Sequence, residues 1–212
     1  MYTLDKNSAK KADQVGKWLT ETGKYIGTIV TAEDIVANTG TRGIVLTLRA
    51  DDGRETRQFI YTEKSNGDRL TGFDLVMALM TCLKLRDIKP VSAKVKRWDN
   101  DAKQEYVADG QVFPELANKR IGFLLQKTEE VSRKDPNDTA WSAKLVAVFE
   151  ANTELMASEI LDGKKSPEAL THRVAQLADR PMRKRPAGSQ TSRSYSDATN
   201  GNGFEQDDDI PF

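Results

Sequence analysis

The chain has 212 residues, and its 32 Lys and Arg balance its 32 Asp and Glu, so the net charge of zero does not by itself indicate a nucleic-acid partner. One cysteine, Cys82, excludes an intramolecular disulfide, and the single histidine, His172, is too distant in sequence to form a zinc site of the usual spacing with it. No apolar run is long enough to span a membrane, and no apolar stretch follows the basic N-terminus as it would in a signal peptide. We therefore expect a cytoplasmic protein with no membrane contact, and we expect no cofactor.

The N-terminal segment, residues 1–22, is mostly polar, but a few apolar residues recur near helical spacing. This pattern predicts a short amphipathic helix over 8–20. Within it, Trp18 is expected to pack against the main domain. Gly23 is expected to end the helix.

The apolar period then changes to two residues, which is typical of strands. We expect a first strand at 25–33, a second around 44–48 and a third at 56–62. Turn residues separate them at 38–40 and at 51–53, and the Asp-Gly pair in the latter is a strong hairpin signal. Three meandering strands indicate a β-barrel or sandwich rather than a parallel sheet.

A helical pattern follows at 71–85. Thr71 with Asp74 three residues later fits a capping box, and a wide apolar face follows. Cys82 lies on this helix and is expected to be a buried, unreactive thiol. Residues 91–98 then predict a fourth strand.

Residues 99–112 are polar, and we expect a loop with only a short strand near Tyr106. Further strands are predicted at 119–128 and 143–149. A mainly β domain over 23–150 with a helix between its third and fourth strands has the element order of an OB-fold barrel, although the additional last strand departs from that order.

Helical patterns return over 151–179, where Ser166 is expected to cap the second helix and His172 to lie on its solvated face. These helices could be an appendage to the barrel or could pair two copies in a homo-oligomer. Residues 180–206 are rich in Pro, Gly, Ser and Asn and contain too few apolar groups to offset the entropy of ordering, so we expect a flexible linker.

The sequence closes with three acidic residues followed by two apolar residues around a proline: Asp207, Asp208, Asp209, Ile210, Pro211 and Phe212. Exposed apolar groups in an unfolded acidic segment gain nothing unless a partner buries them. The proline restricts the backbone and so lowers the entropy cost of docking. We therefore expect 207–212 to bind partner proteins.

Two predicted strands combine cations with aromatic rings on one face, as a sequence-tolerant single-strand binder requires. Alternation along 91–98 places three of these side chains opposite the apolar Ala93 and Val95: Lys94, Lys96 and Trp98. Because the lysines cannot be buried unpaired, we expect this face to bind DNA.

Along the third strand, a second such set alternates with Gln58, Ile60 and Thr62: Arg57, Phe59 and Tyr61. Phe59 and Tyr61 could equally belong to the core, since Ile60 alone would bury little on the other face. Secondary candidates come from other strands: Tyr25, Arg42, Arg49, Lys119 and Arg120.

The ending DDDIPF matches the C-terminal tip of bacterial single-stranded DNA-binding proteins. Most of residues 1–180 resembles phage-encoded single-stranded DNA-binding proteins, which share the opening MYTL and segments like 22–27, 114–116, 119–122 and 156–160. The resemblance implies a protein of the host cytoplasm that coats single-stranded DNA during phage DNA replication and recombination. It also implies that replication, repair and recombination proteins of the host or phage bind the tip.

Two alternatives belong to other functional classes. An adaptor or decoy would use the tip to titrate host proteins without binding DNA itself. An enzyme such as a nuclease would need paired carboxylates on an ordered element, a nucleophile near the histidine or a phosphate-binding loop, and the sequence contains none of these patterns. We therefore do not expect catalysis.

Overall fold

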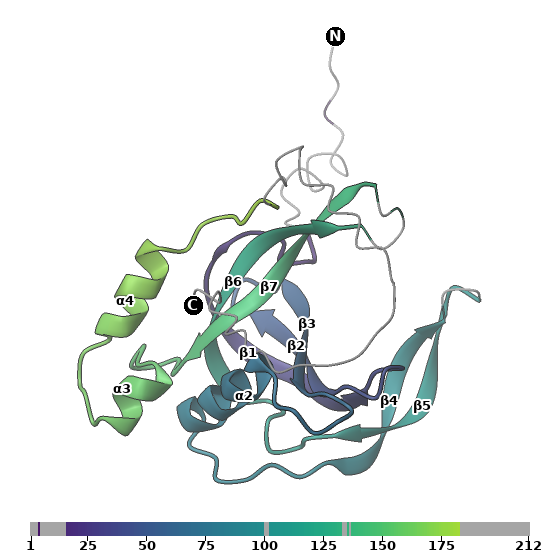
Figure 1. The fold of residues 1–212 in the computed structure, drawn as a ribbon, viewed down its shortest axis with the longest axis horizontal. Helices are drawn as coiled ribbons and strands as arrows, with labels where there is room; N and C mark the ends of the chain where they lie inside the picture. The colour runs from purple at the N-terminus through teal and green to yellow at the C-terminus, as the bar shows by residue number, and fades with distance from the viewer. Residues whose placement is uncertain (1–3, 5–15, 100–101, 133–134, 136, 183–212) are drawn as a thin grey trace, which may run out of the picture. The chain divides into compact units, whose positions relative to one another are not determined.

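The computed structural model describes residues 4, 16–99, 102–132, 135 and 137–182. These residues form a mainly β fold with few helices, as the sequence predicts. The sheet has seven antiparallel strands, and the elements in chain order are β1 (Gly23–Val36), β2 (Arg42–Ala50), β3 (Glu55–Glu63), α2 (Thr71–Cys82), β4 (Val91–Asp99), β5 (Gln104–Val112), β6 (Arg120–Val131), β7 (Thr139–Phe149), α3 (Ala157–Leu161) and α4 (Glu168–Ala175) (Figure 1).

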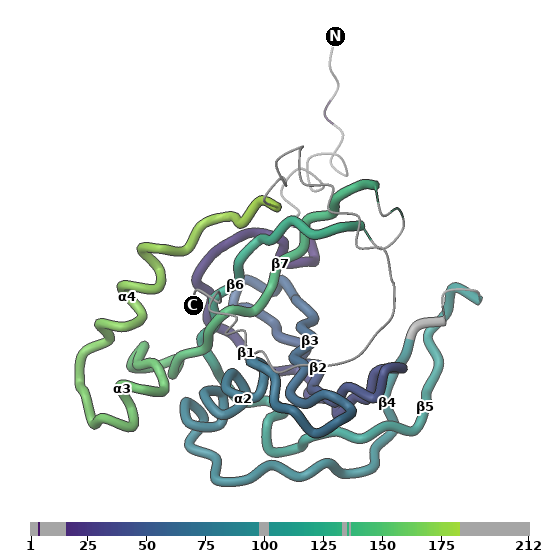
Figure 2. The backbone as a smooth tube through the Cα atoms, in the orientation of Figure 1, coloured from purple at the N-terminus to yellow at the C-terminus, as the bar shows by residue number. Residues whose placement is uncertain are grey.

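The long strand β1 connects the two parts of the sheet. It pairs with β2 over much of its length, with β6 at its start and with β5 only at Glu33 and Asp34. β6 pairs in turn with β7, so five strands follow the order β3-β2-β1-β6-β7 and curve around the main core. The β4–β5 hairpin branches away from this curved sheet (Figure 2).

The curved sheet is not closed by backbone pairing, because β3 and β7 share no ladder among the described residues. The buried side chain of Gln58 spans the gap instead. Its amide nitrogen donates to the carbonyl of Ala143 at 3.0 Å, and its amide oxygen accepts from the N–H of Leu145 at 2.8 Å. One amide side chain thus supplies the two hydrogen bonds that join the outer strands.

Helix α2 packs against the main core, and its position between β3 and β4 is the predicted one. Its buried residues include Cys82, and burial raises the pKa of this thiol to about 12, in agreement with the predicted unreactive cysteine. The predicted capping box is wrong, because the helix begins after Leu70 without a side-chain cap. Gly72 lets the helix approach β3 closely, since a Cβ there would lie 2.2 Å from the carbonyl oxygen of Tyr61.

Helix α4 lies on the opposite side of the sheet from the main core, over β6 and β7, whereas Ala157 and Ile160 of α3 pack against the main core itself. Leu170 of α4 packs with Leu124, Ala147 and Phe149, and all four side chains are buried. The predicted serine cap is wrong, because Pro167 is the N-cap of α4 and makes no side-chain capping bond. Helix α4 therefore covers one outer face of this chain's own sheet.

The end of the predicted N-terminal helix is wrong. Residues 16–20 are extended, and Trp18 forms an isolated parallel bridge with Glu55 of β3. Leu19 is buried, whereas Trp18 is 54% exposed and does not anchor the segment. Residues 8–15 of the predicted helix lie outside the described residues.

The predicted extent of the loop at 99–112 is also wrong, because the short strand expected near Tyr106 is the nine-residue β5, which pairs with β4 along its whole length. A strand with one buried face can be predicted from the alternation of apolar and polar residues in its sequence. β5 has no buried residue, so its sequence lacks that signal.

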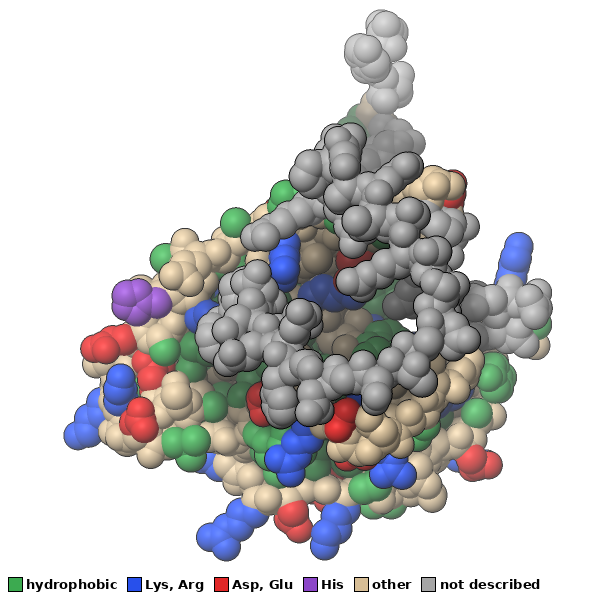
Figure 3. Space-filling view, viewed as in Figure 1, with side chains coloured by type: hydrophobic (Ala, Val, Ile, Leu, Met, Phe, Trp, Pro, Cys, Tyr) green, Lys and Arg blue, Asp and Glu red, His purple; other side chains and the backbone are tan. Residues whose placement is uncertain are grey.

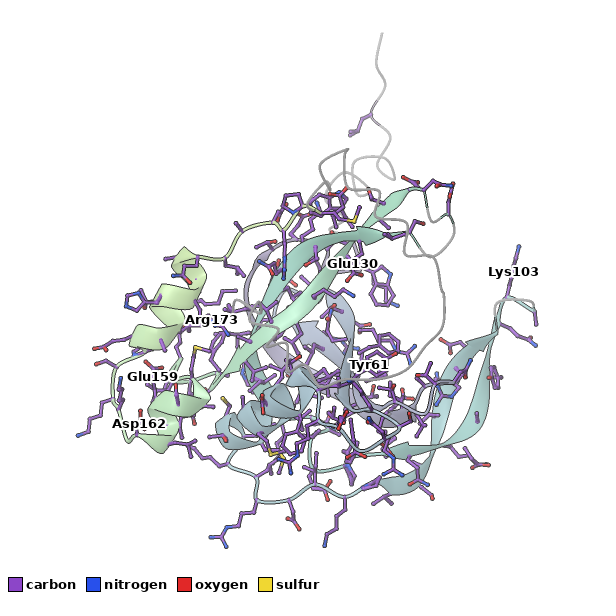
Figure 4. The ribbon with its side chains drawn as sticks, in the orientation of Figure 1. Tyr61, Lys103, Glu130, Glu159, Asp162 and Arg173 are labelled. Atoms are coloured by element: carbon purple, nitrogen blue, oxygen red, sulfur yellow. The ribbon has the colours of Figure 1, made fainter. Side chains whose placement is uncertain are left out.

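A buried carboxylate connects α3 to α4. Glu159 is 1% exposed, and its two oxygens accept hydrogen bonds from the N–H groups of Ala169 at 2.7 Å and Met156 at 2.9 Å (Figure 4). Burial acts to raise the pKa of this carboxyl, but the backbone hydrogen bonds outweigh burial and hold the pKa below its usual value.

We expect Glu159→Gln to lower the free energy of unfolding by about 1–3 kcal/mol at neutral pH, because the amide turns an N–H group toward a backbone donor. A lowered pKa contributes stability that is present above the pKa of the unfolded chain and is lost as pH falls through the folded value. The difference between wild type and variant should therefore shrink from about pH 5 to about pH 2 in urea unfolding. Asp162→Asn, at the exposed C-cap of α3, is the control, and a pH-independent difference would contradict the role of the charge.

Candidate functional site

The outer face of β3 is open to solvent. Along β3, Thr56, Gln58 and Ile60 point into the core, so the alternate residues point outward: Arg57, Phe59 and Tyr61. Phe59 is 53% exposed and Tyr61 39% exposed. Of the two interpretations of these rings, the core assignment is wrong, because α2 and the interior of the sheet are packed without them. Figure 4 labels Tyr61 on this strand.

The neighbouring residues give this face its chemistry. The guanidinium of Arg57 lies 5.4 Å from the centre of the Phe59 ring, within cation–π range. Across the ladder, Phe59 pairs with Val45 of β2, which is 1% exposed, so a buried apolar side chain lies beside the ring on the same face. A flat ring beside a cation is suited to stacking a base next to its phosphate.

Two other predicted cations lie at the margins of the same strands. Arg49 shares the outer face but is bound to Glu55, with its Nε 2.8 Å from the carboxylate. Arg42 is exposed at the start of β2, opposite Glu63, where the register shifts. The structure therefore brings Arg49 together with the three β3 residues and leaves Arg42 beside them.

A buried carboxylate lies where this face meets the β4–β5 hairpin. Glu33 of β1 is 7% exposed, and its oxygens lie 3.2 Å from a guanidinium nitrogen of Arg97 and 4.0 Å from one of Arg57. Arg97 belongs to β4 and Arg57 to β3. The two arginines, distant in sequence, thus meet at one acidic group.

The hairpin register fixes which of its faces is continuous with this site. Glu33 pairs with Val112 of β5, and counting by twos along the ladder places Tyr106 and its partner Arg97 on the same face. Tyr106 is 46% exposed. The face that carries Arg97 and Tyr106 is called here the inner face of the hairpin, and its Arg97 shares the carboxylate of Glu33 with Arg57.

The predicted residues Lys94 and Lys96 lie on the other face of the hairpin, and both are exposed. Each has an acidic partner on β5: Lys94 lies 2.7 Å from Asp109 and Lys96 lies 3.4 Å from Glu105. The backbone of Trp98 pairs with Glu105, and its side chain lies outside the described residues. This face does not meet the Arg57 surface, and its DNA-binding role stays a prediction.

Tyr25 lies apart from both surfaces. Its ring stacks on the buried Phe123 at 5.7 Å between centres, and its hydroxyl donates to the carbonyl of Glu21 at 3.0 Å. Burial raises the pKa of the Tyr25 hydroxyl, while the nearby charge of Arg54 opposes that rise. The ring belongs to the edge of the core.

Sequence reasoning missed Glu33, Arg97 and Tyr106. Alternation along β4 places Arg97 on the same face as Val95, which indicates an inward position. The short strand expected near Tyr106 had no predicted partner, so the sequence assigned its ring to no face. Only the register of β5 against β1 and β4 could have revealed that the three residues share one surface.

The visible face of the described residues carries hydrophobic, basic and acidic side chains intermixed (Figure 3). The predicted tip, 207–212, and most of the predicted linker lie outside the described residues.

No protein-family model matches this sequence, and no curated protein is significantly similar to it. Within the part of the chain that the structure describes, no helix combines the length and the apolar character that crossing a membrane requires.

Proposed function

We propose that this chain binds single-stranded DNA without strong sequence preference and recruits partner proteins through residues 207–212. It would act as a non-catalytic coat during DNA replication, recombination or repair. The observation that carries the DNA-binding proposal is the outer face of β3, where Phe59 and Tyr61 are exposed beside Arg57. Stacking platforms flanked by cations are what binding of any base sequence requires.

The strand arrangement supports an OB-like interpretation of the fold. The order β3-β2-β1-β6-β7, with α2 after β3 and β4–β5 as an inserted hairpin, is that of a five-stranded, partly open barrel. OB-folds bind oligonucleotides on the face of their second and third strands. Arg57, Phe59 and Tyr61 lie on the equivalent face here, while α4 covers the sheet over β6 and β7.

The partner-binding proposal depends on the sequence of the tip, whose apolar residues need a partner to bury them. A six-residue peptide binds weakly, with micromolar affinity as a reasonable scale, and several tips gathered on one DNA strand would raise the effective affinity. The acidic residues could also compete with DNA for the basic face.

The test is binding of fluorescent oligo(dT) to the full chain and to a chain lacking 207–212, over a series of salt concentrations. We expect binding at low salt. The logarithm of the binding constant should fall with the logarithm of the salt concentration, with a slope of about −0.7 for each phosphate contact. The truncated chain should bind DNA more tightly at low salt and lose its protein partners. Unchanged DNA affinity would contradict competition by the tip, and no binding by either chain would favour the adaptor alternative.

A further inference from the structure

We infer that the inner face of the β4–β5 hairpin forms the second half of the DNA-binding surface, with Arg97 contacting phosphate and Tyr106 stacking a base. This inference rests on the proposed function and names residues that the sequence pattern did not identify. The physical basis is that Arg97 and Arg57 meet at Glu33, so the hairpin and β3 contribute to one continuous surface.

The charge balance distinguishes the two faces of the hairpin. On the inner side, one carboxylate, Glu33, lies against two guanidinium groups, which leaves a net charge of about +1 at the junction. On the other side, Lys94 and Lys96 each have an acidic partner, so that face is locally neutral. A phosphate is therefore attracted more strongly to the junction between Arg57 and Arg97.

Both arginines keep hydrogen-bonding capacity for a ligand. Their side chains are 46% exposed for Arg57 and 35% exposed for Arg97, and among the described residues Glu33 is the one acidic partner of each. A guanidinium has five N–H groups in a planar fork that matches the oxygens of a phosphate. The ion pair with the buried carboxylate at 3.2 Å restricts the side chain of Arg97 and so lowers the entropy cost of ordering it on binding.

Aromatic rings lie on both sides of this pair of arginines. Phe59 and Tyr61 come from β3, and Tyr106 comes from β5 and faces Arg97 across the hairpin ladder. Phosphates at the arginines would leave bases free to stack on either side. A single DNA strand that crosses from β3 to the hairpin would place phosphates at the arginines and bases on the rings.

The experiment measures oligo(dT) affinity over a salt series for the full chain carrying Arg97→Ala or Tyr106→Ala. The matched controls are Val107→Ala, a sequence neighbour of Tyr106 on the other face of β5, and Lys165→Ala, an exposed cation just before α4. We expect Tyr106→Ala to weaken binding about fivefold to 150-fold, as loss of one stacked base does. Arg97→Ala should weaken binding about tenfold and reduce the magnitude of the salt slope by about 0.7, and the controls should stay within about twofold of wild type.

Arg97→Lys guards against a folding artefact, because it keeps the charge and should restore the salt slope while recovering only part of the affinity. Binding by Arg97→Ala and Tyr106→Ala that equals wild type would overturn the inference, as would a larger loss in Lys96→Ala than in Arg97→Ala. If these variants bind normally while Arg57→Ala is impaired, this inference fails and the proposed function stands. If the wild-type chain does not bind at low salt, both fail.

Discussion

Replacing Phe59 and Tyr61 together by alanine is expected to weaken oligo(dT) binding by at least about thirtyfold. Each base stacked on an aromatic ring contributes about 1–3 kcal/mol, and the two rings are adjacent on the outer face of β3. Both side chains are substantially exposed, so their removal should leave the core and the melting temperature nearly unchanged. Fluorescence anisotropy with labelled oligo(dT) at fixed salt measures the affinity, and circular dichroism measures the melting temperature.

Three further variants separate stacking from general apolar contact. Phe59→Trp and Tyr61→Phe keep a flat ring and should retain most of the affinity, whereas Phe59→Leu should lose it. Leu161→Ala removes an apolar side chain that is 76% exposed on α3, and it should have no effect on DNA binding. A double alanine variant that binds like wild type would refute the role of this face.

Gln58→Leu is expected to destabilise the fold by about 2–5 kcal/mol, although the two side chains have similar size. The substitution leaves the N–H of Leu145 and the carbonyl of Ala143 without their partner, and each unsatisfied buried group costs about 1–3 kcal/mol. Typical domains unfold at a cost of only about 5–15 kcal/mol, so the loss should be plain in urea unfolding followed by circular dichroism.

The control is Gln111→Leu on β5, where an exposed amide donates to Ser92 at 2.9 Å, and we expect a change below about 0.5 kcal/mol. Because Gln58 lies between Arg57 and Phe59 on β3, loosening it should also reduce DNA affinity under native conditions. Equal stability of Gln58→Leu and wild type would show that the hydrogen bonds between β3 and β7 do not hold the sheet together.

The strands that bury a face were predictable in order and approximate position. The apolar alternation in β1, β2, β3, β6 and β7 reflects the core that each strand lines, and α2 shows its apolar stripe for the same reason. The full length of β5 was not predictable, because this strand buries no residue. The caps of α2 and α4 were misread because serine and threonine near a helix start need not make the capping bond.

The candidate site was likewise predictable only in part. The sequence alone placed Arg57, Phe59 and Tyr61 on one face of a strand, because alternation is a local property of extended backbone. Whether that face was core or surface depended on what packs against it, and only the tertiary structure shows α2 and the interior complete without the two rings.

The sequence by itself thus determined the mainly β class, the helix after the third strand and the residues that share a face within each strand. The tertiary structure decided which faces meet. It joined Arg57 to Arg97 through Glu33, bridged β3 to β7 through Gln58 and separated Lys94 and Lys96 from the Arg57 surface. The physical reason is that alternation acts over a few residues of one strand, whereas register and branching of the sheet are set by hydrogen bonds between strands far apart in the chain.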